Sequence, residues 1–327
     1  MLKSHVVDHI VETSPEDEGD EEEGTAHDDD EPTDPRTALL EELNSMRLTT
    51  NYFNKAREIA TASHQASAYP GPPRTFTAGN IAIHLNYNPT RTGMKLDDIA
   101  DTFNIPGLHH ALSDFLQRDA RNRNLIHGVG VPRRSLIDRP LTLPFDRAQV
   151  WHTVRLQQVS YHDSSAALPA QTLHTSPSSP EWLKGRRDAV LVNIDGQYEW
   201  PQSGLKGKPL SIHQVGLCVL APSGHTVCEL QVIMRPMPRR GSRIGWRDQY
   251  ICYVHNMKIG AVDPVTEMHV LKCARHANGT PVGDIVPLRQ VRSFINLIPQ
   301  FGAVADARLT KATLSHYSSI FFFEQVF

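Results

Sequence analysis

The chain has 327 residues, of which 39% are hydrophobic, and this length suffices for one or two domains with a packed core. No segment reaches the roughly 18 to 20 consecutive apolar residues of a membrane helix, and the first residues lack the apolar core of a secretory signal. The sequence therefore predicts a soluble, intracellular protein with no membrane partner. Its four cysteines are too few for a disulfide scaffold.

The formal net charge of −3 combines two regions of opposite sign. Residues 1–35 hold 14 Asp or Glu and a single base, Lys3, so residues 36–327 hold 22 acids against 32 bases. A basic body favours polyanions such as nucleic acid, because Lys and Arg release counterions from phosphates. The alternative is that the acidic region simply balances the charge of the body.

Residues 1–35 are predicted to form a disordered acidic arm. Like charges repel there, and residues 12–35 offer almost no apolar surface to offset the entropy cost of ordering. A solvated linker is the simplest role for this arm. A docking tail or a mimic of nucleic acid is the alternative.

Residues 36–120 are predicted to form a helical segment with a linker. Apolar spacing indicates a helix that begins after residue 36 and continues to 62, with Phe53 and Ile59 on its apolar side. Residues 66–80, rich in Pro and Gly, are interpreted as a loop.

Two further helices are predicted over residues 95–103 and 108–119, joined by a turn that contains Gly107. A short helix, a tight turn and a second helix are the outline of a helix-turn-helix. The outward side of the second helix carries few bases, so an ordinary helical hairpin that packs on the body is the favoured interpretation.

Residues 121–185 are interpreted as an irregular connecting region, with one alternating stretch, 150–155, that suits a strand. Residues 186–327 are predicted to form a β domain. Its expected strands are 189–194, 214–220, 226–234, 249–256 and 268–274, with a tight turn at Asn278-Gly279.

The predicted fold is therefore α+β: a disordered acidic arm, a short helical region, and a small antiparallel β-barrel-like or sandwich domain. Short strands without long helices between them favour antiparallel pairing. The core of the β domain is expected to include Val192, Ile194, Val219, Leu230, Val232, Tyr253 and Val270.

Sequence motifs for catalysis are missing. No nucleophile elbow, dinucleotide fingerprint, phosphate-binding loop or zinc-protease helix occurs, and the Asp residues stand beside turns without a common spacing. We expect no enzyme activity and no cofactor.

A metal-binding hypothesis rests on two Cys-x-x-His pairs. Cys252 with His255, and Cys273 with His276, provide the ligand types of a tetrahedral zinc site. Both pairs fall in or beside predicted strands, where residues three apart point to opposite faces. Two buried thiols and two surface imidazoles are therefore the favoured interpretation, and no metal site is assigned.

A basic cluster in a predicted hairpin loop is the candidate nucleic-acid-binding site. Arginine grips phosphates and tryptophan stacks on bases. The alternative is a solvated loop whose charges maintain solubility. The candidate residues are Arg235, Arg239, Arg240, Arg243, Trp246 and Arg247.

Several phrases, in a fixed order, carry a resemblance to a known family. They include TFTAGNIAIHLNYNP, DDIADTFNIPGLHHALSDFL, LPFDRAQVWHTVRLQQVSYHD, LVNIDGQYEWPQSGLKG and, most specifically, GTPVGDIVPLRQVRSFINLIPQFGAVADARLT. Over roughly residues 74–327 the chain resembles the C-terminal, non-catalytic region of proteins encoded by Plavaka-type cut-and-paste DNA transposons of fungi.

The resemblance implies an accessory binding module that contacts DNA, chromatin or a transposase core, in the nucleus or the cytoplasm. The family's nuclease core lies upstream of the similar region, so no catalytic residue is carried over. Two alternatives stay open: a truncated relic without a selected activity, and a metal-dependent hydrolase or nuclease that uses scattered Asp and His.

Overall fold

The structure is a computed structural model that describes residues 50–65, 71–121, 143–160, 163, 165–180, 182–183, 185–193, 224–238, 246, 248–300 and 320–323. All of them belong to one compact unit, Ser45–Phe327. The acidic arm, the first part of the expected first helix and the expected strand 214–220 lie outside the described residues.

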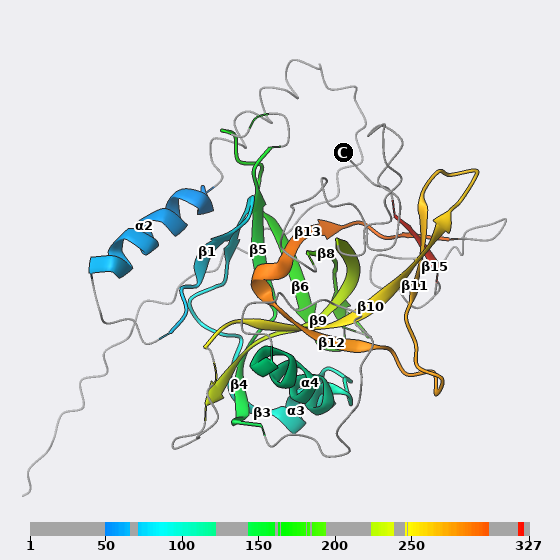
Figure 1. The fold of residues 1–327 in the computed structure, drawn as a ribbon, viewed down its shortest axis with the longest axis horizontal. Helices are drawn as coiled ribbons and strands as arrows, with labels where there is room; N and C mark the ends of the chain where they lie inside the picture. The colour runs from blue at the N-terminus through cyan, green and yellow to red at the C-terminus, as the bar shows by residue number, and fades with distance from the viewer. Residues whose placement is uncertain are drawn as a thin grey trace, which may run out of the picture. The chain divides into compact units, whose positions relative to one another are not determined.

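The described elements are three α-helices, one 3-10 turn and fifteen strands (Figure 1). The helices are α2 (Tyr52–Gln65), α3 (Leu96–Thr102) and α4 (Leu108–Arg121), and the 3-10 turn is Leu288–Gln290. The strands are β1 (Thr75–Ala78), β2 (Ile81–His84), β3 (Arg91–Lys95), β4 (Phe145–Trp151), β5 (Thr153–Gln158), β6 (Gln171–Ser176), β7 (Arg186–Arg187), β8 (Ala189–Asn193), β9 (His225–Pro238), β10 (Ile251–Val262), β11 (His269–Cys273), β12 (Gly283–Pro287), β13 (Val291–Ile295), β14 (Ile298–Pro299) and β15 (Ile320–Phe323).

The strands form a small and a large antiparallel sheet. The small sheet has the order β1-β2-β5-β6-β7, and the large sheet has the path β13-β8-β9-β10-β11-β15-β14, with β4, β3 and β12 attached to it. The helices and the antiparallel sheets confirm the α+β class. The described strands do not form a closed barrel, because the first and last strands of each sheet do not pair with each other.

Two sheets packed face to face build the first hydrophobic cluster. Ile83 and Leu156 of the small sheet meet Leu230 and Val254 of the large sheet in one buried set. Aromatic Trp151 fills the space between them, packed edge-on against Tyr250 with ring centroids 5.4 Å apart. Burial of this apolar surface is the main force that holds the sheets together.

Single residues carry the chain from one sheet to the other. His152 separates β4, in the large sheet, from β5, in the small one, and Asp188 separates β7 from β8 in the same way. The predicted single strand over 150–155 is therefore two strands in different sheets. Alternation of side chains continues across such a corner, so periodicity alone does not reveal it.

The segment 121–185 was predicted to be irregular, and this prediction is wrong. Its described part contributes the strands β4, β5 and β6. The segment 36–120 likewise contributes three strands besides its helices. Strand β1, with Phe76, lies within residues 66–80, which their Pro and Gly content predicted to be a loop. Strands from either side of residues 120 and 186 share each sheet.

Helices α3 and α4 form the predicted hairpin, and they pack on the large sheet. The apolar residues Leu108, Leu112 and Phe115 of α4 are fully buried with Tyr253 and Ile285 in a second cluster. Figure 1 shows α4 beside β12. This burial fits the ordinary helical hairpin that the sequence favoured over a DNA-reading pair.

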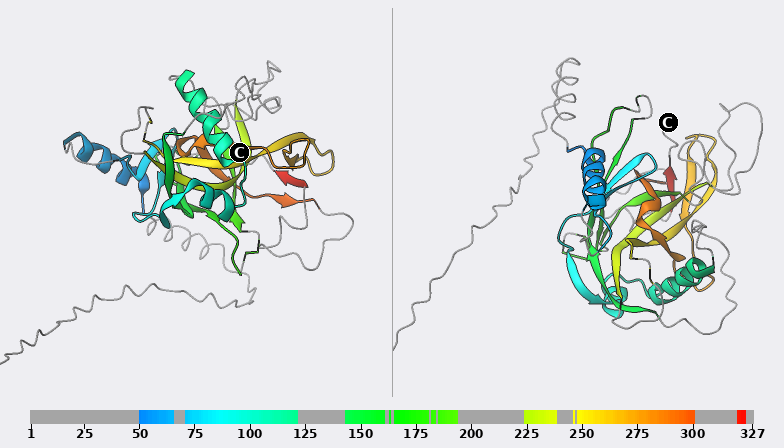
Figure 2. Two further views of the ribbon diagram at one scale, coloured as in Figure 1. Left: turned by 90° about the horizontal axis from the view of Figure 1, so that it is seen from below. Right: turned by 60° about the vertical axis from the view of Figure 1, so that its left-hand side comes forward.

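Helix α2 lies against β1 and β2 of the small sheet (Figures 1 and 2). Its anchor is Tyr52, whose ring stacks on His84 at 4.5 Å and whose hydroxyl accepts a hydrogen bond from Arg155 at 2.8 Å. Phe53 and Ile59, the predicted apolar side, are only half-buried.

The predicted core residues are confirmed in part. Val192, Leu230, Val232 and Tyr253 are buried, whereas Val270 is half-buried. Ile194 and Val219 lie outside the described residues. The Asn278-Gly279 turn is confirmed, with Gly279 at φ +80°, a conformation that glycine adopts without strain.

Candidate ligand-binding cleft

A polar row crosses the large sheet between two apolar clusters on the same face. The register aligns Ala189 of β8, Glu229 of β9, His255 of β10 and Gly283 of β12. The second cluster lies on one side of this row. On the other side a third cluster gathers around Met257. Two small residues, Ala189 and Gly283, therefore flank the Glu229–His255 pair, and the Tyr253 ring lies over Gly283.

A β-bulge in β9 adds a third polar residue to this row. Tyr253 pairs with Val232, but Val254 pairs with Leu230, so Gln231 has no opposite residue on β10. Its amide nitrogen donates to Glu229 Oε2 at 2.8 Å. Bulges redirect side chains and are common beside functional sites.

Glu229 is a half-buried charged group at the floor of this face. His255 Nδ1 lies 3.7 Å from Glu229 Oε2, and 24% of the Glu229 side chain remains accessible. Burial by itself would raise the pKa of Glu229. The hydrogen bond to His255 and the charges of Arg187 and His255 outweigh it, so the pKa lies below its ordinary value. Glu229 therefore carries a negative charge near neutral pH.

Arg187 supplies the opposite charge. Its Nη2 donates to the backbone oxygen of Phe103 at 2.7 Å, and burial lowers its pKa while the Glu229 charge opposes that shift. Arg187 Nε is buried and has no hydrogen-bond partner. A buried donor without a partner is unfavourable by about 1–3 kcal/mol, so a ligand that accepts a hydrogen bond from this atom would gain affinity.

A cleft of about 1340 Å³ opens above this row. Its described lining contains three arginines and two histidines against two acids. One of the acids, Asp188, faces Arg186 at 4.0 Å and accepts a hydrogen bond from the His174 backbone at 2.8 Å. The charged lining residues are Arg186, Arg187, Arg275, His255, His276, Asp188 and Glu229.

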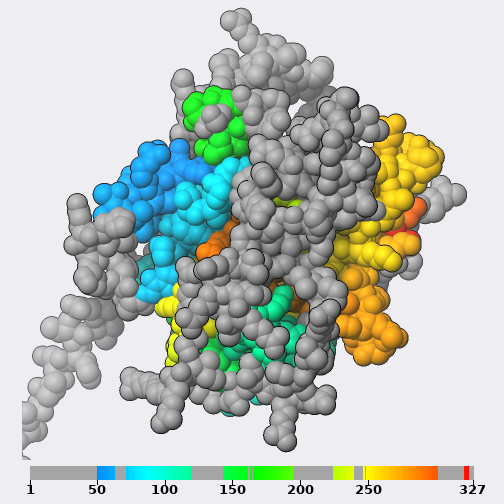
Figure 3. All heavy atoms as spheres, viewed as in Figure 1, coloured from blue at the N-terminus to red at the C-terminus, as the bar shows by residue number. Residues whose placement is uncertain are grey.

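Aromatic and backbone groups complete the cleft wall. The guanidinium of Arg186 lies over the ring of Trp182 at 5.2 Å. Arg275 donates to the backbone oxygen of Gly279 at 2.7 Å, an exposed contact in the β11–β12 turn. In Figure 3 the β10–β11 hairpin (yellow) stands at one side of the molecule, and α2 (blue) at the other.

Three of the four predicted metal candidates line this cleft. They are His255, Cys273 and His276, whereas Cys252 is fully buried in the first cluster, on the opposite face of β10. Burial raises the pKa of Cys252, as expected for an apolar thiol. No group of three or more His, Cys, Asp or Glu among the described residues is arranged to hold a metal ion.

The two described members of the predicted basic loop are engaged in contacts within the protein. Arg235 Nε donates to Asp248 at 2.8 Å. Trp246 packs edge-on against Phe145 with centroids 5.0 Å apart. Arg239, Arg240, Arg243 and Arg247 lie outside the described residues, so their role stays a prediction.

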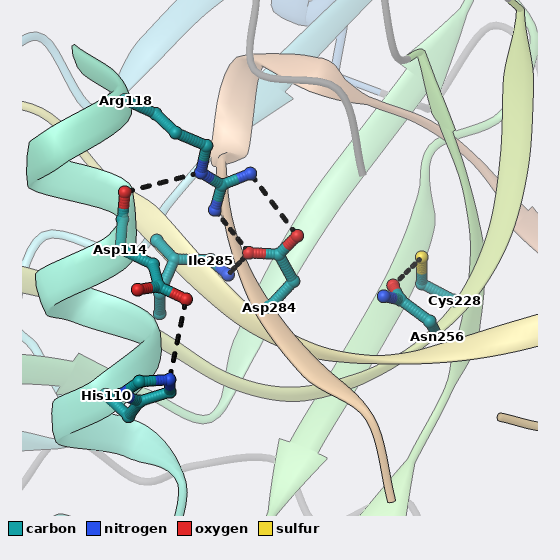
Figure 4. A network of polar contacts seen from close by, with 7 residues as sticks. All are labelled: His110, Asp114, Arg118, Cys228, Asn256, Asp284 and Ile285. Atoms are coloured by element: carbon teal, nitrogen blue, oxygen red, sulfur yellow. Dashed lines mark hydrogen bonds and ion pairs between the residues drawn. The ribbon is translucent and has the colours of Figure 1, made fainter. Parts of the chain in front are cut away.

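A separate polar network clamps α4 onto β12 (Figure 4). Arg118 of α4 forms an ion pair with Asp284 of β12 at 2.5 Å, and Asp284 also accepts from the Ile285 backbone at 2.8 Å. The exposed His110 lies 3.7 Å from the half-buried Asp114, one turn along α4. Because Asp284 is buried and neighbours Gly283, this clamp fixes one wall of the cleft.

Glu229, Gln231 and Arg187 are absent from the predicted site residues. A signal exists: Glu229 places a charge in the middle of a strand, TVCELQVIM, whose residues are mostly apolar and buried. A charge at such a position needs a buried partner, and Arg187 comes from a distant strand that the sequence did not connect to it.

The geometry defines a two-sheet α+β protein with a basic, polar-floored cleft. A family model, "Domain of unknown function (DUF6830)", matches residues 53–223 and 214–271, so the chain belongs to the DUF6830 family. No curated protein and no solved structure matches the chain. None of the described helices has the length and apolar character required to span a bilayer.

Proposed function

We propose that this chain is a non-catalytic nucleic-acid-binding module of a transposon-encoded protein, and that the cleft holds unpaired nucleotides. The carrying observation is the charge of the cleft, where three arginines and two histidines face two acids that already have partners in the protein. An excess of cationic donors attracts phosphates.

The size and lining of the cleft support single-stranded nucleic acid. Its volume exceeds the ~300–1,000 Å³ typical of small-ligand pockets, so it has room for more than one nucleotide. Trp182 and the arginines are the residue types that hold bases and backbone in single-strand sites. The resemblance to transposon-encoded proteins agrees with a nucleic-acid partner and with a nuclear location.

Fluorescence anisotropy of the full chain with a labelled single-stranded oligonucleotide, over a salt series, tests this proposal. Binding should weaken steeply as salt rises. Arg275→Ala should weaken it about 3- to 10-fold and reduce the salt slope by about 0.7, because one phosphate contact is lost.

Lys272→Ala is the matched control. Lys272 is exposed on β11, one residue from Cys273, and it does not line the cleft. Lys272→Ala removes the same charge from the same strand region as Arg275→Ala. An equal loss of oligonucleotide affinity in both variants would therefore indicate only a general charge effect. Absence of binding even at low salt would reject nucleic acid and leave a protein partner, such as a transposase core, to be sought.

The predicted loop is tested in the same assay. Replacement of Arg239, Arg240 and Arg243 by Ala should weaken binding if the loop extends the nucleic-acid surface beyond the cleft. If this variant binds normally while Arg275→Ala does not, the cleft alone carries the interaction.

A further inference from the structure

One oxygen of the Glu229 carboxylate is free to contact a ligand. Gln231 donates to Oε2, and His255 also approaches Oε2, whereas Oε1 has no hydrogen bond to any described residue. Oε1 is not among the buried atoms without partners, in keeping with the accessible part of this side chain. A carboxylate accepts several hydrogen bonds, so Glu229 presents an unused acceptor to the cleft.

The neighbours of Glu229 oppose a cationic ligand. Arg187 lies close enough to lower the pKa of the carboxyl, and Arg186 and Arg275 line the same cleft. A lysine or arginine from a partner would face repulsion from all three. The ligand that fits is therefore a neutral edge of hydrogen-bond donors attached to an anionic backbone.

We infer that Glu229 recognises the Watson–Crick edge of an unpaired guanine. Guanine is the base whose edge presents two adjacent donors, N1–H and the N2 amino group, and a carboxylate accepts both. Adenine and cytosine each place one donor beside an acceptor, and thymine places one donor between two acceptors. Guanine O6, which follows N1–H on this edge, matches a donor such as Arg187.

The floor of the cleft has the space that a base edge requires. Ala189 and Gly283 are the cross-strand neighbours of the Glu229–His255 pair. The Tyr253 ring occupies the place of a side chain at Gly283, so it is the small side chain of Ala189, which lines the cleft, that leaves room beside the carboxylate. Larger residues in this row would fill the region above the carboxylate.

This inference rests on the proposed function, and base preference separates the two. The probes are thymidine oligonucleotides that carry one central guanine, inosine or adenine, and binding to the full chain is measured by anisotropy. Guanine should bind about 10-fold more tightly than adenine, because only guanine can donate two hydrogen bonds to the carboxylate. Inosine lacks the amino group and should fall between them.

Two variants assign the preference to Glu229. Glu229→Gln replaces an acceptor with an amide and should remove the guanine preference while thymidine binding persists. Glu229→Asp keeps the charge opposite Arg187 but draws the carboxylate back, so it should fold and also lose the preference. A thermal melt of each variant verifies folding.

Each remaining outcome overturns the inference in a recognisable way. Oligonucleotide binding without base preference, or a preference that survives both variants, rejects guanine recognition and leaves the proposed function standing. No oligonucleotide binding rejects both. Glu229-dependent binding of a lysine- or arginine-rich peptide would replace guanine by a protein ligand.

Discussion

The two faces of the large sheet differ in what neighbouring residues do. Leu230 and Val254 point into the layer between the two sheets. The described side chains of the first cluster in that layer are apolar, except for the Tyr250 hydroxyl, the Trp151 ring nitrogen and the buried thiols. Glu229 and His255, one residue away on the same strands, face the opposite side, where the charge of Arg187 acts on Glu229.

This difference separates stability from recognition within a single sheet. The inner face gains its free energy from area removed from water, which is insensitive to orientation. The polar row on the other face, between two apolar clusters, holds charges that are tolerated because they are paired, and such pairs add little net stability. Variants of adjacent residues should therefore give different phenotypes.

The largest effect is expected on the inner face. Leu230→Ala should lower the free energy of unfolding by about 3 kcal/mol, because it removes buried methyl groups and leaves a cavity between the sheets. Urea unfolding measures the loss. A loss below about 0.5 kcal/mol would mean that the two sheets are not packed as described.

A smaller loss is expected at the wall of the cleft. Asp284→Ala should lower the free energy of unfolding by about 2 kcal/mol, because the partly buried Arg118 loses its counter-charge. Combining it with Arg118→Ala should cost less than the sum of both single variants. Strict additivity in this double-mutant cycle would show that the ion pair contributes nothing.

A third, weaker effect is expected on the polar row itself. Glu229→Gln should lower stability at neutral pH by about 1 kcal/mol, because Arg187 loses its charge partner. The folded pKa of Glu229 lies below its ordinary value of 4.5, so its contribution is present above that pH and disappears as pH falls through the folded pKa. Urea unfolding at a series of pH values should show the two curves converging in acid.

The smallest effect concerns the small sheet. Burial first, then the charges of Lys55 and Arg155, lower the pKa of His84 to about 4. Between pH 6.5 and about 4 the unfolded chain binds more protons, so stability falls as pH falls through this window. His84 is partly exposed, and with allowance for solvent screening the loss is about 0.5–1 kcal/mol.

His84→Phe keeps a ring against Tyr52 and cannot be protonated. Its stability should stay flat over the same pH window, apart from slopes that other groups give to both proteins. A slope equal to that of the unaltered chain would show that His84 does not cause the acid loss.

The sequence predicts those helices and strands whose apolar residues follow a regular local pattern. The hairpin over 95–119 was predictable because its apolar residues recur at helical spacing and all face the sheet. The strands around Leu230 and Val254 were predictable because they are short segments rich in β-branched and aromatic residues between turn signals. The clusters they join were not, because pairing partners such as Ala189 and Glu229 are far apart in the chain.

Irregular features escaped prediction for local reasons. Simple alternation would place Leu230 and Val232 on one face of β9, but the bulge at Gln231 sends them to opposite faces. The floor of the cleft follows from that shift. His255 was noticed for its spacing from Cys252, yet its relevant partner is Glu229, which no spacing rule connects to it.

The single-residue corners at His152 and Asp188 have a consequence for folding during synthesis on the ribosome. Synthesis delivers β4 long before β9, yet Val150 pairs with Met234 and both sheets share the chain at each corner. All strands of the small sheet precede β9, but the large sheet that covers it cannot assemble until β9 and β10 have emerged, and pairings of such long range form slowly. The nascent chain therefore carries unpaired, aggregation-prone strand edges for much of its elongation, and its yield in cells should depend on chaperones that shield them.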